Sequence, residues 1–167
     1  SGIRGTIGGK VDDNLTPVDV VKFTAAFGTW LQKTQNKKDL TLVIGRDARI
    51  SGAMVNSLVT ATLQGLGIHV VDLGLSTTPT VEVMVPELNA DGGIILTASH
   101  NPKQWNALKL LNEKGEFISG KDGAEMLEIA EKEDFNFAEV DDLGKYETRT
   151  DAFDIHIQKI LDLPMVD

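Results

Sequence analysis

The sequence of 167 residues contains no cysteine, a single tyrosine and no long apolar run. Without cysteine the chain can form neither a disulfide nor a thiolate metal site, which fits a reducing cytoplasm. No stretch approaches the roughly 20 apolar residues that a membrane span needs, and the first residues lack the apolar run of a signal peptide. The composition therefore predicts a cytoplasmic protein with no membrane partner.

The sequence also has no excess of basic residues. It contains 16 Lys and Arg residues and 25 Asp and Glu residues, which gives a net charge of −9. Nucleic-acid binding needs a positively charged footprint, so we expect no nucleic-acid partner. Twelve of the acidic residues but only four lysines lie between Glu113 and Glu147, and the first 112 residues are close to neutral. We interpret the acidic segment as a solvated helix and loop. A local phosphate pocket elsewhere is compatible with this charge distribution.

Helix and strand patterns alternate along the chain, which predicts an α/β sandwich. Short apolar runs bounded by glycine or turn residues predict strands at 3–7, 40–44, 68–73, 92–96 and 107–111. Helices are expected to begin at Thr16-Pro17, Ser51-Gly52 and Thr78-Pro79, and near residues 121 and 151. Apolar residues at helical spacing after Thr16, among them Phe27 and Trp30, are expected in the core.

The clearest chemical pattern follows the predicted strand 92–96 and reads Thr97-Ala98-Ser99-His100-Asn101-Pro102. The end of such a strand is the edge where open α/β sheets place ligands. Asn101-Pro102 turns the chain away from the strand direction. Lys109 follows about one short hairpin later, so its ammonium can return to the same edge. Ser99 is therefore expected to be exposed near a positive charge.

Several roles for Ser99 remain open from the residues alone. A serine in a turn is often a local hydrogen-bonding group. A hydrolase would need a histidine base, but His100 should point away from its neighbour, His69 and His156 lie in apolar patterns, and no G-x-S-x-G elbow is present. A phosphoryl carrier needs only an exposed hydroxyl, nearby positive charge and a divalent ion.

Four ordered motifs over about the first 110 residues resemble the α-D-phosphohexomutase superfamily, which comprises phosphoglucomutase, phosphomannomutase and phosphoglucosamine mutase. The segment 97–102 is similar to the family's active-site serine loop, and Leu161-Asp162-Leu163-Pro164 resembles the link into its second domain. The other matching motifs are Ser1-Gly2-Ile3-Arg4-Gly5, Gly45-Arg46-Asp47-Ala48-Arg49-Ile50-Ser51-Gly52 and Asn106-Ala107-Leu108-Lys109. The resemblance departs from the family at Ala107, where many members have glycine, and at Trp105, where tyrosine is common.

The resemblance implies a three-layer α/β/α sandwich with a mixed, mostly parallel sheet. Residues 1–150 would form the N-terminal domain that bears the phosphoserine loop, and residues 151–167 a terminal helix and the start of a linker to an absent second domain. The implied activity is that of an isomerase, an intramolecular phosphotransferase that interconverts hexose 1-phosphate and 6-phosphate. A bound 1,6-bisphosphate is the implied intermediate, and glucose, mannose or glucosamine phosphates are the implied substrates.

The resemblance also assigns roles to individual residues. Ser99 would carry the phosphoryl group, Arg4 would stabilise developing charge beside it, and Lys109 would be a general acid or base for the sugar hydroxyl. His100 and Asn101 would shape the loop and contact phosphate oxygens. For Arg46, Asp47 and Arg49, direct phosphate contact and a salt-bridged brace behind the loop remain alternatives.

The family's magnesium is held by an Asp-rich loop of the second domain together with the phosphoserine, and no Asp-x-Asp-x-Asp cluster occurs here. Mg²⁺ would therefore meet this chain only through the phosphate on Ser99, and a glucose 1,6-bisphosphate-type activator would load that serine. Because the sugar-binding loops belong to later domains, we expect this chain alone to be inactive. The competing hypothesis is a phosphosugar-binding module without turnover.

Overall fold

The computed structural model describes residues 2–165, so Ser1 of the opening motif and the last two residues of the predicted linker lie outside the described residues. A six-stranded sheet has the order β1-β5-β4-β2-β3-β6. Neighbouring strands are parallel from β4 through β2 and β3 to β6, while β5 is antiparallel to β1 and to β4. The predicted mixed, mostly parallel sheet is confirmed. The strands are β1 (Ile3–Thr6), β2 (Thr41–Arg46), β3 (His69–Leu75), β4 (Gly92–Leu96), β5 (Trp105–Leu111) and β6 (Tyr146–Thr148).

The helices begin where polar cap residues satisfy the free N–H groups of the first turn. Thr16 and Ser119 each form a capping box, before α1 and α4 respectively. At α3 the cap is Thr77 rather than the expected Thr78, because the Thr77 hydroxyl accepts the N–H of Thr80. The helices are α1 (Pro17–Gln35), α2 (Gly52–Gly65), α3 (Thr78–Glu87), α4 (Gly120–Lys132) and α5 (Ala152–Leu161).

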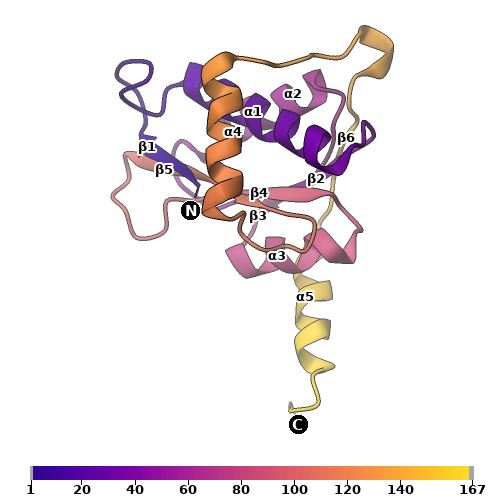
Figure 1. Ribbon diagram of the computed structural model, residues 1–167. Helices are drawn as coiled ribbons and strands as arrows, with labels where there is room; N and C mark the ends of the chain where they lie inside the picture. The colour runs from indigo at the N-terminus through magenta and orange to yellow at the C-terminus, as the bar shows by residue number, and fades with distance from the viewer. Residues whose placement is uncertain (1, 166–167) are drawn as a thin grey trace.

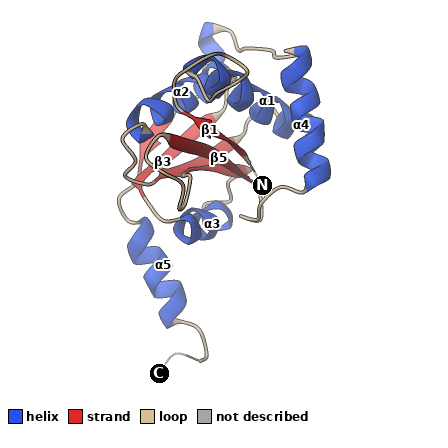
Figure 2. Cartoon of the chain, turned by 90° about the vertical axis from the view of Figure 1, so that its left-hand side faces the viewer, coloured by secondary structure: helices blue, strands red, loops and turns tan. Residues whose placement is uncertain are grey.

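The helices form two layers around the sheet. Figure 2 shows α1, α2 and α4 on one face and α3 on the other, which confirms the predicted three-layer sandwich. β5 illustrates how the sequence fills both interfaces, since side chains alternate along a strand. Leu108 and Leu110 are buried with Phe27 in the core under α1, whereas Leu111 is buried in the core under α3. α5 extends away from the body beyond α3 (Figure 1).

The strand directions bring several chain segments to one edge of the sheet. β1 and β4 are both antiparallel to β5, so β1, β2, β3 and β4 all end at the same edge. The segment after β2 and the segment after β4 therefore meet there, beside the beginning of β5. This is the edge at which the sequence predicts a ligand.

Two features of the sheet differ from the sequence prediction. β5 begins at Trp105 instead of residue 107, because Trp105 and Asn106 pair with Thr6 and Gly5 of β1. β6 was not expected, since it consists of three exposed residues in a polar stretch and gains its strand conformation by pairing with β3.

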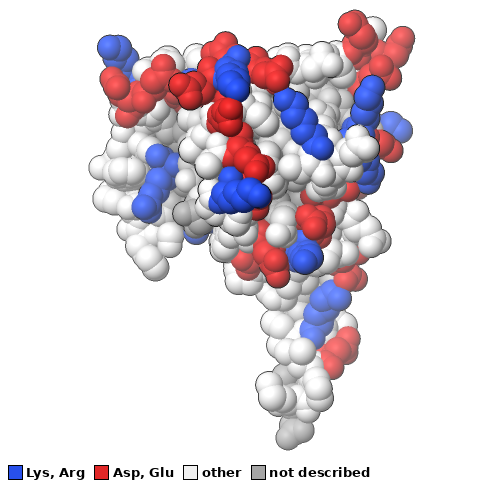
Figure 3. Space-filling view, viewed as in Figure 1, with Lys and Arg blue, Asp and Glu red and all other residues white. Residues whose placement is uncertain are grey.

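The acidic segment is largely a solvated surface, as predicted. α4 buries Met126 and Ala130 toward the core, while Glu125, Glu128 and Glu131 are exposed. Figure 3 shows acidic side chains gathered over this helix. Among the helices within residues 2–165, none has the length and apolar content needed to cross a membrane.

Candidate functional site

A shallow pocket of about 270 Å³ opens at the edge where β1, β4 and β5 meet. We call it the serine pocket, and we call residues 97–102 the serine loop. Ligand pockets for whole drug-sized molecules usually measure roughly 300–1,000 Å³, so this volume suits a phosphate-sized group or one part of a larger ligand. Its lining residues are Arg4, Thr97, Ala98, Ser99, Asn101, Ala107 and Lys109.

Strand register places the two cations of the serine pocket on one face of the sheet. Arg4 lies opposite Ala107 in the antiparallel pair of β1 and β5, and directly opposed residues share a face. Lys109 is two residues further along β5 and therefore points to the same face. The small Ala107 side chain leaves space between the two long cations. The sheet thus presents a guanidinium and an ammonium to the same hollow.

The lining of the serine pocket contains these two cations and no carboxylate. Within residues 2–165, neither Arg4 nor Lys109 takes part in an ion pair. Two positive charges without a protein counter-ion favour an anionic ligand, and phosphate accepts charge-assisted hydrogen bonds from both side-chain types.

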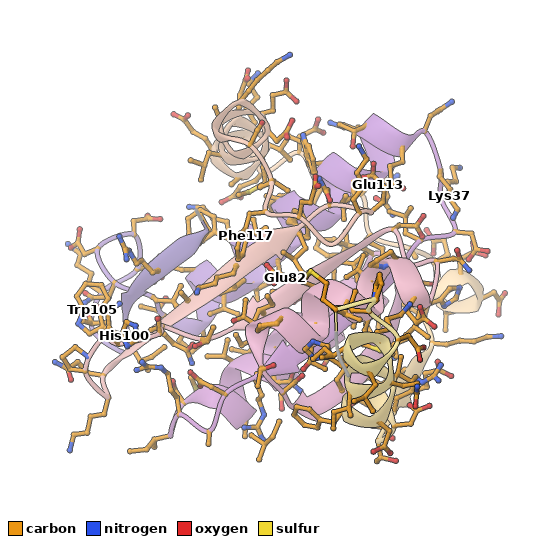
Figure 4. All side chains as sticks on the ribbon, turned by 90° about the horizontal axis from the view of Figure 1, so that it is seen from below. Lys37, Glu82, His100, Trp105, Glu113 and Phe117 are labelled. Atoms are coloured by element: carbon orange, nitrogen blue, oxygen red, sulfur yellow. The ribbon has the colours of Figure 1, made fainter. Side chains whose placement is uncertain are left out.

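One carboxyl group outside the pocket lining interacts with Lys109 through space. Glu82 of α3 lies toward the same face of the sheet, as Figure 4 shows from the α3 side. Burial raises the pKa of the Glu82 carboxyl, and the positive charge of Lys109 offsets part of that rise. No direct ion pair joins the two described side chains.

Ser99 is exposed and has φ = 55°, in the left-handed region that residues other than glycine seldom occupy. Such a conformation costs on the order of 1–3 kcal/mol and persists only when surrounding contacts impose it. The Ser99 N–H donates to Thr97 Oγ1 at 3.1 Å, and the Ser99 carbonyl accepts from Arg49 Nη2 at 2.9 Å. The main chain of the serine is therefore held on both sides.

The loop after β2 lies behind the serine loop, and none of its charged residues lines the serine pocket. Arg46 Nη1 donates to the carbonyl of Asp47 at 3.2 Å. Arg49 Nε donates to Asp47 Oδ2, and its four other N–H groups face main-chain oxygens. For Arg49 these contacts favour the brace over direct phosphate contact, because all five N–H donors of its guanidinium are used. The accepting carbonyls belong to Ser99, Asn101, Pro102 and Trp105.

Two of the histidines are committed to other contacts. His69 Nε2 lies 2.8 Å from Asp39 Oδ1, and its Nδ1 accepts the N–H of Lys145. His156 Nδ1 lies 2.9 Å from Thr80 Oγ1. Neither ring lines the serine pocket, so the structure gives no support to a serine–histidine hydrolase.

The third histidine, His100, is exposed next to Ser99 and also stands outside the pocket lining. Figure 4 shows His100 near Trp105, at the end of the sheet that carries the serine loop. Asn101 lines the pocket, and its Nδ2 and N–H both donate to the carbonyl of Ala98, at 2.9 and 3.0 Å. Asn101 thus closes the turn of the serine loop.

The described residues do not form a magnesium site by themselves. Within residues 2–165, no group of three or more His, Asp or Glu side chains is arranged to hold a metal ion. Asp47 is the acidic residue bonded to the serine loop, but both of its oxygens accept hydrogen bonds, from Arg49 and from Thr97. Mg²⁺ requires near-octahedral oxygen ligands, which the Ser99 hydroxyl alone cannot supply.

Sequence reasoning did not single out Thr97 or Glu82. A signal for Thr97 was present, because a hydroxyl two residues before Ser99 can accept a main-chain N–H in a turn. Glu82 gave no signal, since it approaches Lys109 only through the packing of α3 on the sheet. Asn106, which the resemblance noted, is fully buried and donates to Ser51 Oγ at 2.8 Å, joining β5 to the start of α2.

Fold and pocket together define an α/β/α domain that presents an exposed serine and two cations in one pocket at the edge of its sheet. Residues 1–137 match the family described as phosphoglucomutase/phosphomannomutase, alpha/beta/alpha domain I. The chain belongs to this family, and the match confirms the resemblance drawn from the sequence motifs.

Similar proteins carry mutase names. The phosphoglucomutase/phosphomannomutase of Thermococcus kodakarensis is 36% identical over 143 residues, which cover 84% of this chain and 31% of that protein. The phosphoglucosamine/phosphogalactosamine mutase of Sulfurisphaera tokodaii is 36% identical over 138 residues, with 83% and 28% covered. A putative phosphomannomutase structure from Thermus thermophilus superimposes with a TM-score of 0.78 at 28% identity, over 97% of this chain and 35% of that one. This chain spans about a third of the length of these relatives.

Proposed function

We propose that this chain is the phosphoryl-carrying domain of a phosphohexomutase and that Ser99 carries the phosphoryl group. The observation that supports the proposal is the serine pocket, where an exposed serine lies with two cations that have no ion-pair partner among the described residues. A phosphoryl group needs this combination, because its transfer depends mainly on positioning and on compensation of oxygen charge.

In the proposed reaction, phosphorylated Ser99 gives its phosphoryl group to the free hydroxyl of a hexose 1-phosphate or hexose 6-phosphate. The bond between Ser99 Oγ and phosphorus breaks, a bond from the sugar oxygen to phosphorus forms, and the proton of the sugar hydroxyl ends on Ser99 Oγ, which becomes a free hydroxyl again. The bound product is a 1,6-bisphosphate. After this intermediate reorients, its other phosphoryl group returns to Ser99, so that the phosphate has moved between C1 and C6.

The pocket residues have separate roles in this proposal. Arg4 stabilises charge on the transferring oxygens through a fixed guanidinium. Lys109 exchanges a proton with the sugar hydroxyl. His100 and Asn101 shape the serine loop around the phosphate. The contacts of Arg49 support a role in bracing the loop.

The remaining requirements of the reaction lie outside the described residues. Mg²⁺ would neutralise phosphoryl charge and would meet this chain through the phosphate on Ser99, with its other ligands supplied by the rest of a longer polypeptide. A glucose 1,6-bisphosphate-type activator would load Ser99. We propose glucose, mannose or glucosamine phosphates as substrates, in a cytoplasmic enzyme. We further propose that α5 leads from the domain of residues 1–150 into the remaining domains.

The test is turnover by the full-length protein in both directions, with glucose, mannose and glucosamine phosphates. Ser99→Ala should abolish conversion in both directions together, because it removes the only group proposed to hold the phosphoryl between half-reactions. Ser57→Ala is a matched control, since Ser57 lies on the surface of α2 and its hydroxyl donates to the carbonyl of Ala53. That variant should retain wild-type turnover.

Retained turnover in Ser99→Ala would refute the proposal. A wild-type protein that binds hexose phosphates but converts none of them would instead support the phosphosugar-binding module. Lys109→Ala separates phosphorylation of Ser99 from turnover. The variant should still accept a phosphoryl group on Ser99 from glucose 1,6-bisphosphate, while it converts substrate slowly.

A further inference from the structure

Three side chains hold the main chain of Ser99 by a connected set of hydrogen bonds: Asp47 and Arg49 lie behind the serine pocket, and Thr97 belongs to its lining. We infer that Asp47, Arg49 and Thr97, which we call the serine brace, are positioning residues that fix Ser99 in its left-handed conformation and so set the direction of its hydroxyl. The inference rests on the proposed role of Ser99 as phosphoryl carrier and extends it to residues that do not react.

On the amide side of Ser99, the brace is a relay of two hydrogen bonds. The Thr97 hydroxyl donates to Asp47 Oδ2 at 2.6 Å, and Thr97 Oγ1 accepts the N–H of Ser99 at 3.1 Å. The carboxylate takes up the only hydroxyl hydrogen, so a lone pair of the threonine oxygen remains directed at the serine amide. Valine at position 97 would keep the shape and lose both bonds.

On the carbonyl side, the brace is the guanidinium of Arg49. Its Nη1 and Nη2 groups donate at 2.9–3.1 Å to four carbonyls between Ser99 and Trp105. Only 11% of the Arg49 side chain is exposed, and its Nε and main-chain N–H both donate to Asp47. Lysine could not replace this planar fork, because its ammonium has three donors on a flexible stem. The hydrogen bonds on both sides of Ser99, through Thr97 and through Arg49, therefore connect it to the Asp47 carboxylate.

The brace opposes the intrinsic preference of serine for negative φ. If it were weakened, Ser99 would gain freedom to leave φ = 55°, and the Cα–Cβ bond that carries the hydroxyl would change direction. Phosphoryl transfer needs near in-line geometry, and a misplacement of about 1 Å commonly costs about 10²-fold in rate. Asp47 and Arg49 do not line the serine pocket. Thr97 does line it, but its hydroxyl is engaged with Asp47 and with the Ser99 N–H. Weakening the brace should therefore lower kcat and leave KM nearly unchanged.

The experiment compares Arg49→Lys, Thr97→Val and Thr97→Ser in the full-length protein. It measures kcat, KM and the hydrogen–deuterium exchange of peptides that cover the serine loop. Arg49→Lys and Thr97→Val should each lower kcat by about 10²-fold, keep KM close to wild type and speed exchange in the loop. Thr97→Ser retains the hydroxyl and should restore most of kcat and of the protection.

Two control variants test whether any similar loss of contacts would act in the same way. Arg149→Lys changes a guanidinium that is paired with Asp151 just after β6, at the opposite end of the strand order from β1. Thr62→Val removes a hydroxyl that donates to a helix carbonyl in α2. Both should leave kcat and serine-loop exchange at wild-type values.

Wild-type kcat and wild-type loop exchange in Arg49→Lys and Thr97→Val would overturn the inference while leaving the proposed function intact. A raised KM with unchanged exchange would also overturn it, because the residues would then act on the ligand directly. If Arg49→Lys does not fold, the Thr97→Val and Thr97→Ser pair decides. If wild-type Ser99 is never phosphorylated, the proposed function fails, and loop exchange alone decides on the brace, with faster exchange supporting it and unchanged exchange overturning it.

Discussion

Two polar clusters lie on different parts of the sheet, and they differ in whether their charged groups are paired. At the β3–β6 pair, Asp72 is buried and its carboxylate accepts from Tyr146 Oη at 2.6 Å, from Asn56 Nδ2 at 2.9 Å and from the N–H of Gly74 at 2.8 Å. Each of these donors ends on the same carboxylate. We call this group the Asp72 cluster.

The serine pocket shows the opposite pattern. Arg4 and Lys109 have no ion-pair partner within residues 2–165, and the exposed Ser99 lines the same pocket. Polar groups that satisfy one another stabilise the fold and have little capacity left for a ligand. Unpaired cations around an exposed hydroxyl retain that capacity. The comparison therefore separates polar residues that hold the domain together from those available for chemistry.

The largest effect that would sharpen this contrast is expected at Arg4. Arg4→Ala should lower turnover of the full-length protein by about 10²–10³-fold, because it removes a donor from the transition state. Its thermal stability should stay at the wild-type value, since Arg4 is exposed and lacks an ion pair in the described chain. Steady-state kinetics and a thermal unfolding scan measure the two quantities.

Arg149→Ala is the matched control, because it removes an arginine that is paired with Asp151 away from the serine pocket. This variant should keep wild-type turnover. Equal loss of activity in both arginine variants, or full activity of Arg4→Ala, would contradict the distinction between paired and unpaired cations.

A change at Asp72 is expected to have an intermediate effect, on stability and not on phosphorylation of Ser99. Asp72→Ala would leave three donors without their acceptor, and the free energy of unfolding should fall by about 3 kcal/mol. The folded variant should still accept phosphate on Ser99. Urea unfolding followed by circular dichroism measures the loss, with Asp134→Ala as a control at an exposed surface pair with Lys33. A stability loss no larger than in this control would show that the Asp72 cluster does not stabilise the fold.

The smallest effect is expected at Tyr146, which is 45% exposed and can exchange its hydrogen bond for water. Tyr146→Phe should lower the free energy of unfolding by roughly 1 kcal/mol. The hydrogen bond to Asp72, aided by burial, raises the pKa of Tyr146 from 10.0 to about 12. A raised folded pKa gives a contribution that is complete below about pH 10 and is lost as the pH rises toward 12.

Unfolding measurements between about pH 9 and pH 12 test the sign of this linkage. The difference in stability between wild type and Tyr146→Phe should shrink across that interval. A difference that stays constant, or grows, would mean that the tyrosine hydroxyl is not bound to the Asp72 carboxylate.

Features encoded by neighbouring residues could be predicted from the sequence. β4 occupies residues 92–96 as expected, because a contiguous apolar run defines it. The serine loop was found because its residues are adjacent and follow that strand. The shared face of Arg4 and Lys109 was not predictable, since it depends on the register between β1 and β5, which lie about a hundred residues apart in sequence.

The brace shows the same limit at the level of side chains. The sequence left Arg49 between phosphate contact and support of the loop, and only the folded chain shows its donors on carbonyls of residues 99–105. β6 was missed because three polar residues carry no strand pattern without their partner β3. Contacts between distant segments therefore account for most of what sequence reasoning could not reach.

The most direct test of the account is to find where a transferred phosphoryl group resides. The full-length protein is incubated with glucose 1,6-bisphosphate, digested, and its phosphopeptides are mapped by mass spectrometry. The account predicts one modified peptide with phosphate on Ser99, and none in Ser99→Ala. Phosphate on another serine near this edge, such as Ser51 or Ser76, together with an active Ser99→Ala protein, would contradict it.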